Sequence, residues 1–265
     1  MKAVSYFEKL RAACLARDSL LCIGLDPDPK VLGGGLEGAV DFCRRLVETT
    51  ADIACCYKPN AAFWEQYGPR GWEGLARIRQ SVPQDIPVLL DCKRADVPNT
   101  MAAYAAAVFD AMAFDAATVH AYHGADSLAP FAAYADRGVY VVCHTSNPGR
   151  ADLQHLRCGP DPLFMAVAEL AVRSDRHGNV GVVIGATAPE EAAAVRARFP
   201  ELPFLLPGIG RQGGDVEAAV RASFSGDPVS CLVAVAGAVM YADEPRSAAT
   251  AWRDRMRRAA DAVRA

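Results

Sequence analysis

The sequence lacks the features that would place the chain in a membrane or on a nucleic acid. No stretch reaches the roughly 18 consecutive apolar residues that a membrane span requires, and residues 1–18 carry too many charges for the apolar core of a secretory signal. The net charge is −3 and the isoelectric point is near 6.0, so the basic excess of a nucleic-acid-binding protein is missing. We therefore expect a cytoplasmic protein with no membrane and no nucleic-acid partner.

The nine cysteines also lack the spacing of a metal-binding or disulfide framework. Their number is odd, they are dispersed along the chain, and no Cys-x-x-Cys motif occurs. This pattern argues against a zinc knuckle, a thioredoxin-like motif and a set of disulfides. Several, such as Cys22, Cys143 and Cys231, lie within apolar runs, where a reduced cysteine behaves as a small hydrophobic side chain. We expect the cysteines to belong to the core.

No linker, low-complexity tract or short repeat divides the 265 residues, so we expect one domain that spans residues 1–265. Short apolar runs alternate with longer, alanine-rich amphipathic segments. The apolar runs are continuous rather than alternating, which is typical of strands buried on both faces of a parallel sheet. Eight such strand–helix units in a chain of this length predict an α/β fold, namely a (β/α)8 TIM barrel.

The pattern places each of these elements along the chain. We expect strands at residues 21–25, 53–57, 88–90, 117–119, 139–143, 180–184, 204–206 and 231–235. We expect helices near residues 36–51, 70–81, 99–113, 125–136, 161–174, 188–198, 212–223 and 243–264. A further helix is predicted at Tyr6–Arg17, because Ser5 and Glu8 have the spacing of a capping box.

Polar and glycine-rich residues follow most of the predicted strands, where the active sites of this fold lie. The densest group follows the third strand, where two carboxylates and two cations fall between Asp91 and Asp96. Residues i and i+2 of a strand share a face, so Asp91 and Lys93 are expected to point the same way. An Asp–Lys–Asp array held partly out of water keeps its lysine protonated and able to donate a proton. The alternative is a solvated ion-pair cluster without chemistry.

Five segments together resemble the signatures of orotidine 5′-phosphate decarboxylases, most closely those of their longer bacterial subfamily. They are Gly-Leu-Asp-Pro-Asp at 24–28, Tyr-Lys-Pro-Asn at 57–60, Asp-x-Lys-x-x-Asp-x-x-x-Thr at 91–100, Thr-Ser-Asn-Pro-Gly at 145–149, and Pro-Gly-Ile-Gly-x-Gln-Gly-Gly-Asp at 207–215. The resemblance implies a homodimer without cofactor or metal, whose two shared active sites bind a pyrimidine nucleotide or nucleoside. It also implies decarboxylation of orotidine 5′-monophosphate to uridine 5′-monophosphate.

The resemblance assigns the catalytic roles to four positions. Lys93 resembles the lysine that delivers a proton to C6 of the pyrimidine. Asp91 would flank it from the same subunit, and Asp96 would be contributed by the partner. Lys58 resembles the lysine that holds Asp91 and contacts the ribose. A fixed ammonium near C6 would stabilise the carbanion that decarboxylation generates there.

The resemblance also implies a set of substrate-binding residues. Asp26 matches a residue that binds a ribose hydroxyl of the substrate. Thr100 matches a residue that binds the substrate from across the subunit interface. Ser146 resembles the residue that reads the amide edge of the pyrimidine. Pro207 begins the segment that carries Gln212, which resembles a residue bridging the base and phosphate contacts.

The chain departs from the family at the phosphate end. After the eighth strand the family usually has an arginine that grips the 5′-phosphate, and here that position is Gly237. Loss of a bidentate arginine–phosphate contact matters unless another cation replaces it. Arg211, directly before Gln212, is one candidate, and the alternatives are that Arg211 faces solvent or that the substrate carries no 5′-phosphate.

Three histidines, His120, His123 and His144, follow the fourth and fifth predicted strands. They could in principle hold a metal, but His120 and His123 would not share a strand face, and the lysine–aspartate system needs no metal. We expect no metal and no cofactor. His155 and His177 are expected to be solvated loop residues.

Three interpretations of function follow from the sequence. The first is decarboxylation of orotidine 5′-monophosphate in pyrimidine biosynthesis. The second keeps the catalytic residues but changes the substrate to a modified or unphosphorylated nucleoside, or makes the chain an inhibitor-resistant copy in a specialised pathway. The third is a non-catalytic nucleotide-binding homologue, against which the presence of all four catalytic positions argues.

Overall fold

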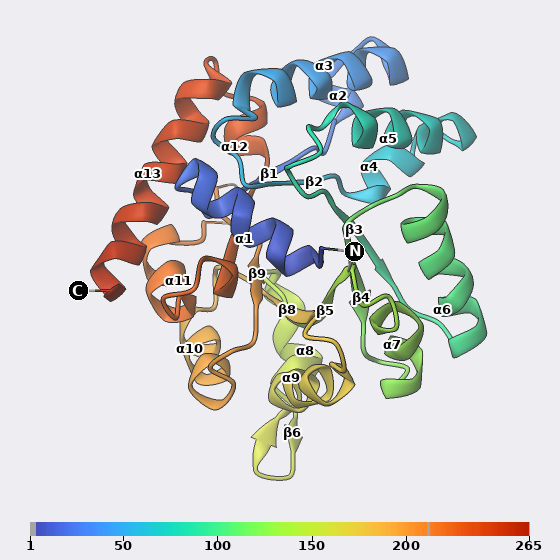
Figure 1. Cartoon of the computed structure of the whole chain (residues 1–265). Coiled ribbons are helices and arrows are strands. Elements are labelled where there is room, and N and C mark those ends of the chain that lie inside the picture. The colour runs from blue at the N-terminus through green and yellow to red at the C-terminus, as the bar shows by residue number, and fades with distance from the viewer. Residues whose placement is uncertain (1–3, 211–212, 265) are drawn as a thin grey trace.

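A computed structural model describes residues 4–210 and 213–264 of the chain. Over these residues, eight parallel strands form one sheet in the order β2-β1-β10-β9-β8-β5-β4-β3, which curls into a barrel with helices outside it (Figure 1). The strands are β1 (Leu21–Gly24), β2 (Cys56–Lys58), β3 (Leu89–Arg94), β4 (Ala116–His120), β5 (Gly138–His144), β8 (Val180–Ile184), β9 (Phe204–Leu206) and β10 (Cys231–Val235). The predicted (β/α)8 barrel is confirmed.

The barrel closes between β2 and β3, which are joined by isolated bridges rather than by a continuous ladder. Tyr57 is bridged to Val88 and Asn60 to Asp91. The backbone N–H of Asp91 donates to the carbonyl of Pro59 at 2.9 Å. This seam fixes the end of β3 against the segment that follows β2.

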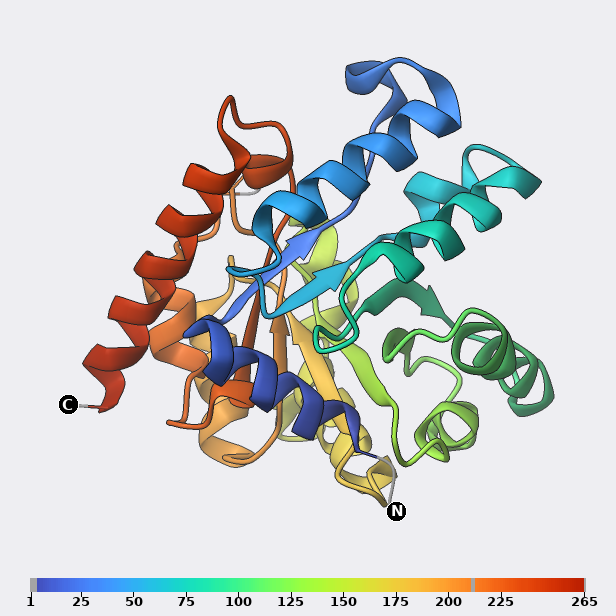
Figure 2. The same ribbon diagram turned by 45° about the horizontal axis from the view of Figure 1, so that its top comes forward.

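Helices cover the outside of the barrel, as the turned view shows (Figure 2). The longer ones are α1 (Tyr6–Arg17), α3 (Gly35–Thr50), α5 (Pro69–Ser81), α6 (Pro98–Ala105), α7 (Ala125–Ala132), α9 (Leu163–Ser174), α10 (Pro189–Arg198), α11 (Val216–Ser223) and α13 (Pro245–Arg264). The shorter ones are α2 (Pro29–Leu32), α4 (Ala61–Glu65), α8 (Ala151–Gln154) and α12 (Gly237–Met240). A π-helical turn at Ala106–Ala111 continues α6. None of the helices in the described part of the chain is long and apolar enough to cross a membrane.

Most predicted elements occur where the sequence places them, and the last three strands match to the residue. The second strand begins at Cys56 rather than at residue 53, because the N–H groups of Ile53 and Ala54 still bond to the carbonyl of Thr50 and prolong the end of α3. The four short helices and a hairpin of β6 (Arg157–Cys158) and β7 (Asp161–Pro162) were not predicted. They are too short to leave a periodic signal.

The N-terminal helix closes the end of the barrel opposite the strand carboxyl ends. Its predicted capping box is confirmed, since Ser5 and Glu8 cap each other's backbone N–H groups. Tyr6 packs edge-on against Tyr140 inside the barrel, and α1 lies across the barrel end in Figure 1. A Cβ at Gly138 would collide with the Tyr6 ring, so this strand must begin with glycine for α1 to dock.

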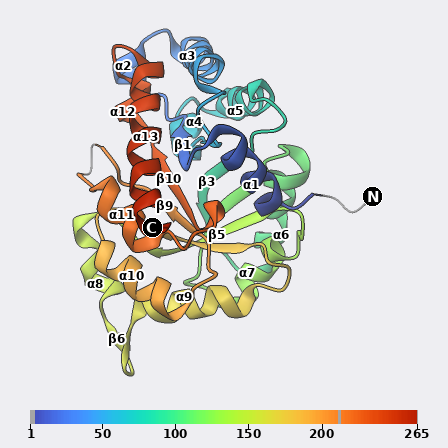
Figure 3. The ribbon, with the colours of Figure 1, turned by 60° about the vertical axis from the view of Figure 1, so that its left-hand side comes forward.

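The cysteines follow the expectation with one clear exception. Seven are buried, and Cys92 is partly buried. Cys158 is exposed, so its assignment to the core was wrong. The reason is its place in the β6–β7 hairpin, which projects away from the barrel (Figure 3).

The docking of α1 gives a stability prediction. Gly138→Ala should lower the free energy of unfolding by about 1–3 kcal/mol, because the added methyl group overpacks the contact with Tyr6. Urea unfolding followed by circular dichroism measures the effect. Gly149→Ala is the matched control, since a Cβ there meets no atom closer than 3.6 Å. Equal stability of the two variants would show that α1 tolerates displacement.

Candidate active site

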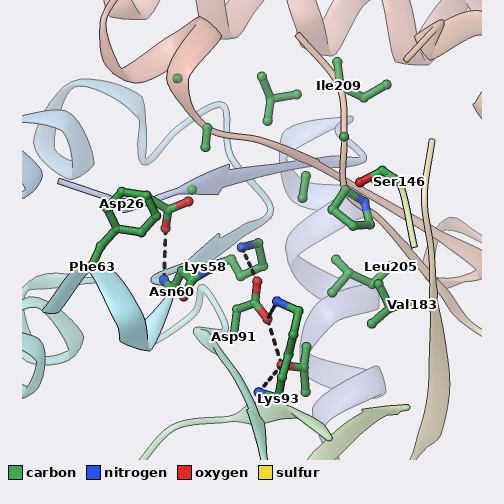
Figure 4. A pocket seen from close by; sticks show the side chains of 18 of the residues that line it. Asp26, Lys58, Asn60, Phe63, Asp91, Lys93, Ser146, Val183, Leu205 and Ile209 are labelled. Atoms are coloured by element: carbon green, nitrogen blue, oxygen red, sulfur yellow. Dashed lines mark hydrogen bonds and ion pairs between the residues drawn. The ribbon is translucent and has the colours of Figure 1, made fainter. Parts of the chain in front are cut away.

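A cavity of about 450 Å³ lies at the carboxyl ends of the barrel strands (Figure 4). Its floor is the apolar barrel interior, including Val142, Val183 and Leu205. Polar side chains from the strands and from the loops that follow them form its walls: Asp26, Asp28, Lys58, Asn60, Asp91, Lys93, Thr118, Thr145, Ser146 and Asn147. A ligand in this cavity would therefore rest on an apolar base and meet polar groups around its edge.

The carboxylate of Asp91 lies between two ammonium groups. Its Oδ2 is 3.0 Å from Nζ of Lys58, and its Oδ1 is 2.6 Å from Nζ of Lys93. Lys58 and Asp91 are buried, whereas the Lys93 side chain is 42% exposed within the pocket. Lys93 is thus the cation of the pair that a ligand or solvent can reach. The expectation that Asp91 and Lys93 point the same way is confirmed.

Local backbone geometry, rather than regular strand alternation, brings Lys93 to this position. The β3–β4 register shifts between Leu90 and Arg94, and Lys93 has φ of 45°. A side chain in this left-handed region is strained, and such residues cluster at functional sites. The backbone N–H of Lys93 donates to Oγ1 of Thr118 at 3.0 Å, which fixes the bulge.

Thr118 is a site residue that the sequence reasoning missed. Its hydroxyl donates to Oδ1 of Asp91 at 2.8 Å and accepts from Lys93, so it ties the carboxylate to the bulge. The available signal was a single hydroxyl in the buried fourth strand. A buried hydroxyl requires a hydrogen-bond partner, and the charged group on the neighbouring strand supplies it.

Burial and charge act in opposite directions on these groups. Burial would raise the pKa of the Asp91 carboxyl, but Lys58 and Lys93 outweigh it and hold that pKa well below its usual range. Burial would likewise lower the pKa of Lys58, but the carboxylates of Asp91 and Asp26 raise it above its usual range. Both groups therefore stay charged at neutral pH.

A second polar group lies beside the first strand. Oδ1 of Asp26 accepts the backbone N–H of Asn60 at 2.9 Å, as Figure 4 shows. Burial raises the pKa of Asp26. The hydroxyl of Tyr241 accepts the N–H of Asp28 at 2.9 Å and donates to the carbonyl of Asp26 at 3.1 Å. The loop after β1 is thereby fixed to the helix that follows β10.

Ser146 and Pro207 line another part of the pocket wall. Figure 4 places Ser146 across the cavity from Asp26. A Cβ at Gly185 would lie 2.8 Å from the backbone of Ser146, so glycine at the end of β8 makes room for the Ser146 loop. Sequence reasoning therefore placed Asp26, Ser146 and Pro207 in the same cavity that the structure forms.

Two predicted site residues do not line the pocket. The carboxylate of Asp96 accepts the N–H of Val97 at 2.7 Å, and Thr100 lies in α6. Neither belongs to the pocket lining of this chain. Gln212 and Arg211 lie outside the described residues.

The far end of the pocket contains the Gly237 position noted in the sequence. Among the described lining residues, Lys58 and Lys93 are the only cations, and both lie beside Asp91. Asp26 and Asp28 add negative charge, and Gly237 lines the wall without a side chain. The described part of this wall therefore offers no cationic side chain to an anion.

The histidines after β4 and β5 lie in different environments. Burial and the nearby Lys93 lower the pKa of His120, whereas His123 is exposed. His144 is fully buried and contacts His155, with their Nε2 atoms 2.9 Å apart. His155 is exposed, as expected, and its ring also contacts the ring of His144. His177 is exposed, as expected.

The chain resembles known proteins over nearly its whole length. The family model described as orotidine 5′-phosphate decarboxylase / HUMPS family matches residues 19–252. Orotidine 5′-phosphate decarboxylase of Thermomicrobium roseum is 46% identical over 267 residues, which cover 98% of this chain and 95% of that protein.

Solved structures agree with this relationship. The structure of Leishmania donovani OMP decarboxylase superposes with a TM-score of 0.91 at 42% identity, covering 97% of this chain and all of the other. Leishmania donovani UMP synthase matches with a TM-score of 0.92 at 43% identity. That match covers 99% of this chain but only 57% of the synthase, so this chain spans little more than half of that protein.

The charge arrangement around Asp91 gives a pH-dependent prediction. Asp91→Asn should lower the free energy of unfolding by about 3 kcal/mol at pH 7, because it leaves two ammonium groups unpaired. The pKa of Asp91 is depressed on folding, so its contribution is complete above its unfolded pKa of about 3.9 and is lost as the pH falls below that value. The stability difference from the parent should shrink between pH 5 and pH 3.

Urea unfolding at pH 7, 5, 4 and 3 measures that difference. Asp41→Asn is the control, because Asp41 forms only an exposed ion pair with Arg44 and should change stability by less than about 0.5 kcal/mol at each pH. A difference for Asp91→Asn that stays constant down to pH 3 would contradict a depressed pKa.

Proposed function

The chain belongs to the orotidine 5′-phosphate decarboxylase / HUMPS family, and we propose how its pocket residues carry out the reaction of that family. It is a carboxy-lyase of pyrimidine biosynthesis that converts orotidine 5′-monophosphate to uridine 5′-monophosphate. One observation carries the proposal: the carboxylate of Asp91 is held between Lys58 and Lys93 at the pocket wall.

Lys93 is the proposed proton donor. When the bond between C6 and the carboxylate carbon breaks, CO₂ leaves and the electron pair stays on C6. The ammonium of Lys93 stabilises that developing charge and then transfers its proton to C6. Its exposed side chain can regain a proton from solvent after the product leaves.

Asp91 and Lys58 position the proton donor. Asp91 holds Nζ of Lys93 at 2.6 Å, and Lys58 and Thr118 hold Asp91 in turn. Because Asp91 stays ionised, its charge would also repel a substrate carboxylate placed beside it, and that repulsion is relieved as CO₂ departs. The network therefore favours the transition state over the bound substrate.

The substrate would span the pocket between two walls. Asp26 is suited to accept a hydrogen bond from a ribose hydroxyl, because the backbone N–H of Asn60 fixes its carboxylate at the pocket edge. Ser146, across the cavity, would bond the amide edge of the pyrimidine, with Pro207 beside it. The apolar floor would support the ring itself.

A homodimer would complete the site. Asp96 and Thr100 lie in and after the loop that follows β3, and neither lines the pocket of its own chain. Val97, beside Asp96, is an exposed apolar residue at 51% exposure, which suits a contact between subunits. We place Asp96 and Thr100 in the partner's site.

Gly237 favours a second candidate substrate, an unphosphorylated or modified nucleoside. The described pocket wall at that end offers no cation, so recognition of a 5′-phosphate would depend on Arg211 or on backbone groups. A charged hydrogen bond typically contributes about 1.5–3 kcal/mol, or roughly 10- to 100-fold in binding. The contribution of the 5′-phosphate to substrate binding can therefore be measured directly.

The catalytic proposal predicts complementation between two inactive variants. Lys93→Ala and Asp96→Ala should each lose nearly all turnover of orotidine 5′-monophosphate. Mixed dimers should regain activity, because one of the two shared sites then contains both native residues. Lys30→Ala, which removes an exposed lysine on α2, is the control and should keep full activity. Turnover by Lys93→Ala would exclude Lys93 as the proton donor. Mixed dimers that are shown to contain both variants but have no activity would exclude a shared site.

The phosphate end predicts a change in substrate preference. We expect Arg211→Ala to lower kcat/KM for orotidine 5′-monophosphate by roughly 10- to 100-fold and to leave orotidine unaffected. Gly237→Arg, which restores the family's residue, should raise kcat/KM for the phosphorylated substrate only. Steady-state kinetics on both substrates measures the ratio. Equal wild-type kcat/KM values for the two would show that the enzyme does not use the 5′-phosphate for recognition.

A further inference from the structure

Three potential metal ligands converge outside the decarboxylation pocket. They are His144 at the end of β5, His155 at the C-cap of α8, and Glu191 in the first turn of α10. The two Nε2 atoms are 2.9 Å apart, and Nε2 of His155 is 3.6 Å from Oε1 of Glu191. All three ligand atoms lie within 4.8 Å of one another, and none of these residues lines the pocket.

The hydrogen bond between the two histidine rings does not include Glu191. In the hydrogen bond between the two Nε2 atoms one ring donates a proton and the other accepts it, so this bond joins only two of the three groups. The remaining approach, from His155 to Glu191 at 3.6 Å, is longer than a hydrogen bond. A cation at the centre would be shared by all three atoms.

The rings are held in place before any ion arrives. His144 has no exposed surface, so the side chains packed around its ring fix its position. Phe164 of α9 packs edge-on against the His144 ring, with centroids 5.2 Å apart, and also contacts His155 at 6.0 Å. The carboxylate of Glu191 is partly exposed, which leaves a route for an ion from solvent.

We propose that Nε2 of His144, Nε2 of His155 and Oε1 of Glu191 form a site for a divalent transition-metal ion such as Zn²⁺. In a tetrahedral site with bonds of about 2.0–2.1 Å, neighbouring ligand atoms lie roughly 3.3 Å apart. The observed 2.9 and 3.6 Å fall on either side of that value. Two imidazoles and one carboxylate suit Zn²⁺, Co²⁺ or Ni²⁺ rather than Mg²⁺ or Ca²⁺.

The site would act on the position of a pocket loop and not on the chemistry. The N–H of Thr145, directly after His144, donates to Oε1 of Gln154 at 2.9 Å, and Nε2 of Gln154 donates to Oγ1 of Thr145 at 2.8 Å. Residues 144–155 therefore form a closed unit whose two ends are both metal ligands. A bound ion would tie this unit, which carries Ser146, to α10.

Metal binding by purified, chelator-treated protein tests the proposal without any assay of activity. Calorimetric titration with Zn²⁺ should show one ion bound per chain, and Co²⁺ should give the visible absorption of a tetrahedral complex. His155→Gln and Glu191→Gln should each weaken Zn²⁺ binding by at least about tenfold, the lower end of what losses around a metal site cause. Both positions are at least partly exposed, so both variants should fold.

Two controls address other ligands on the surface. His177→Gln removes an exposed loop histidine, and Cys158→Ser removes the exposed thiol that follows His155 in the sequence. Both should bind Zn²⁺ as the parent does. Unchanged binding by His155→Gln or by Glu191→Gln, loss of binding by Cys158→Ser, or no binding by the parent at 10-fold excess Zn²⁺ would each overturn the proposal.

Discussion

The active site depends on keeping one buried carboxylate charged. Asp91 is out of water, where an unpaired charge is very unfavourable, and two ammonium groups at 3.0 and 2.6 Å offset that penalty. These groups come from β2 and from the end of β3, which meet only through isolated bridges. Closure of the barrel at this seam therefore brings Lys58 to Asp91, and their ion pair in turn links the two strands that no continuous ladder joins.

The two ends of the barrel have different roles: one is closed by α1, and the other holds the pocket. At one end, α1 seals the interior with aromatic packing around Tyr6 and Tyr140, and the strands there are tightly constrained. At the other, the bulge in β3 holds Lys93 at a positive φ, and the pocket stays open. Backbone strain at a functional residue persists only where the surroundings over-determine it. The hydrogen bonds of Thr118 to both Lys93 and Asp91 provide that constraint.

The sequence predicted the barrel and the central charge cluster because both rest on local patterns. Continuous apolar runs identify buried parallel strands, and the close spacing of Asp91, Lys93 and Asp96 identifies a charge cluster at the end of one strand, although the bulge rather than strand alternation sets the direction of Lys93. Contacts between distant segments leave no such pattern. Thr118 on the neighbouring strand and His155, which meets His144 through a short unpredicted helix, were therefore found only in the structure. The role of Asp96 depends on a second chain and stays a prediction.

Different strands supply the catalytic residues and the phosphate-binding end of the pocket. The residues at the phosphate-binding end can therefore change while the catalytic residues stay the same. The charged network uses β2, β3 and β4, where Lys58, Asp91 and Thr118 lie. Gly237 follows β10, which β1 separates from β2, and among the described residues it shares no hydrogen bond or ion pair with that network. In this fold each loop after a strand can change without displacing the others. A substitution at position 237 can thus alter which substrate is held while Lys93 keeps the geometry for proton delivery.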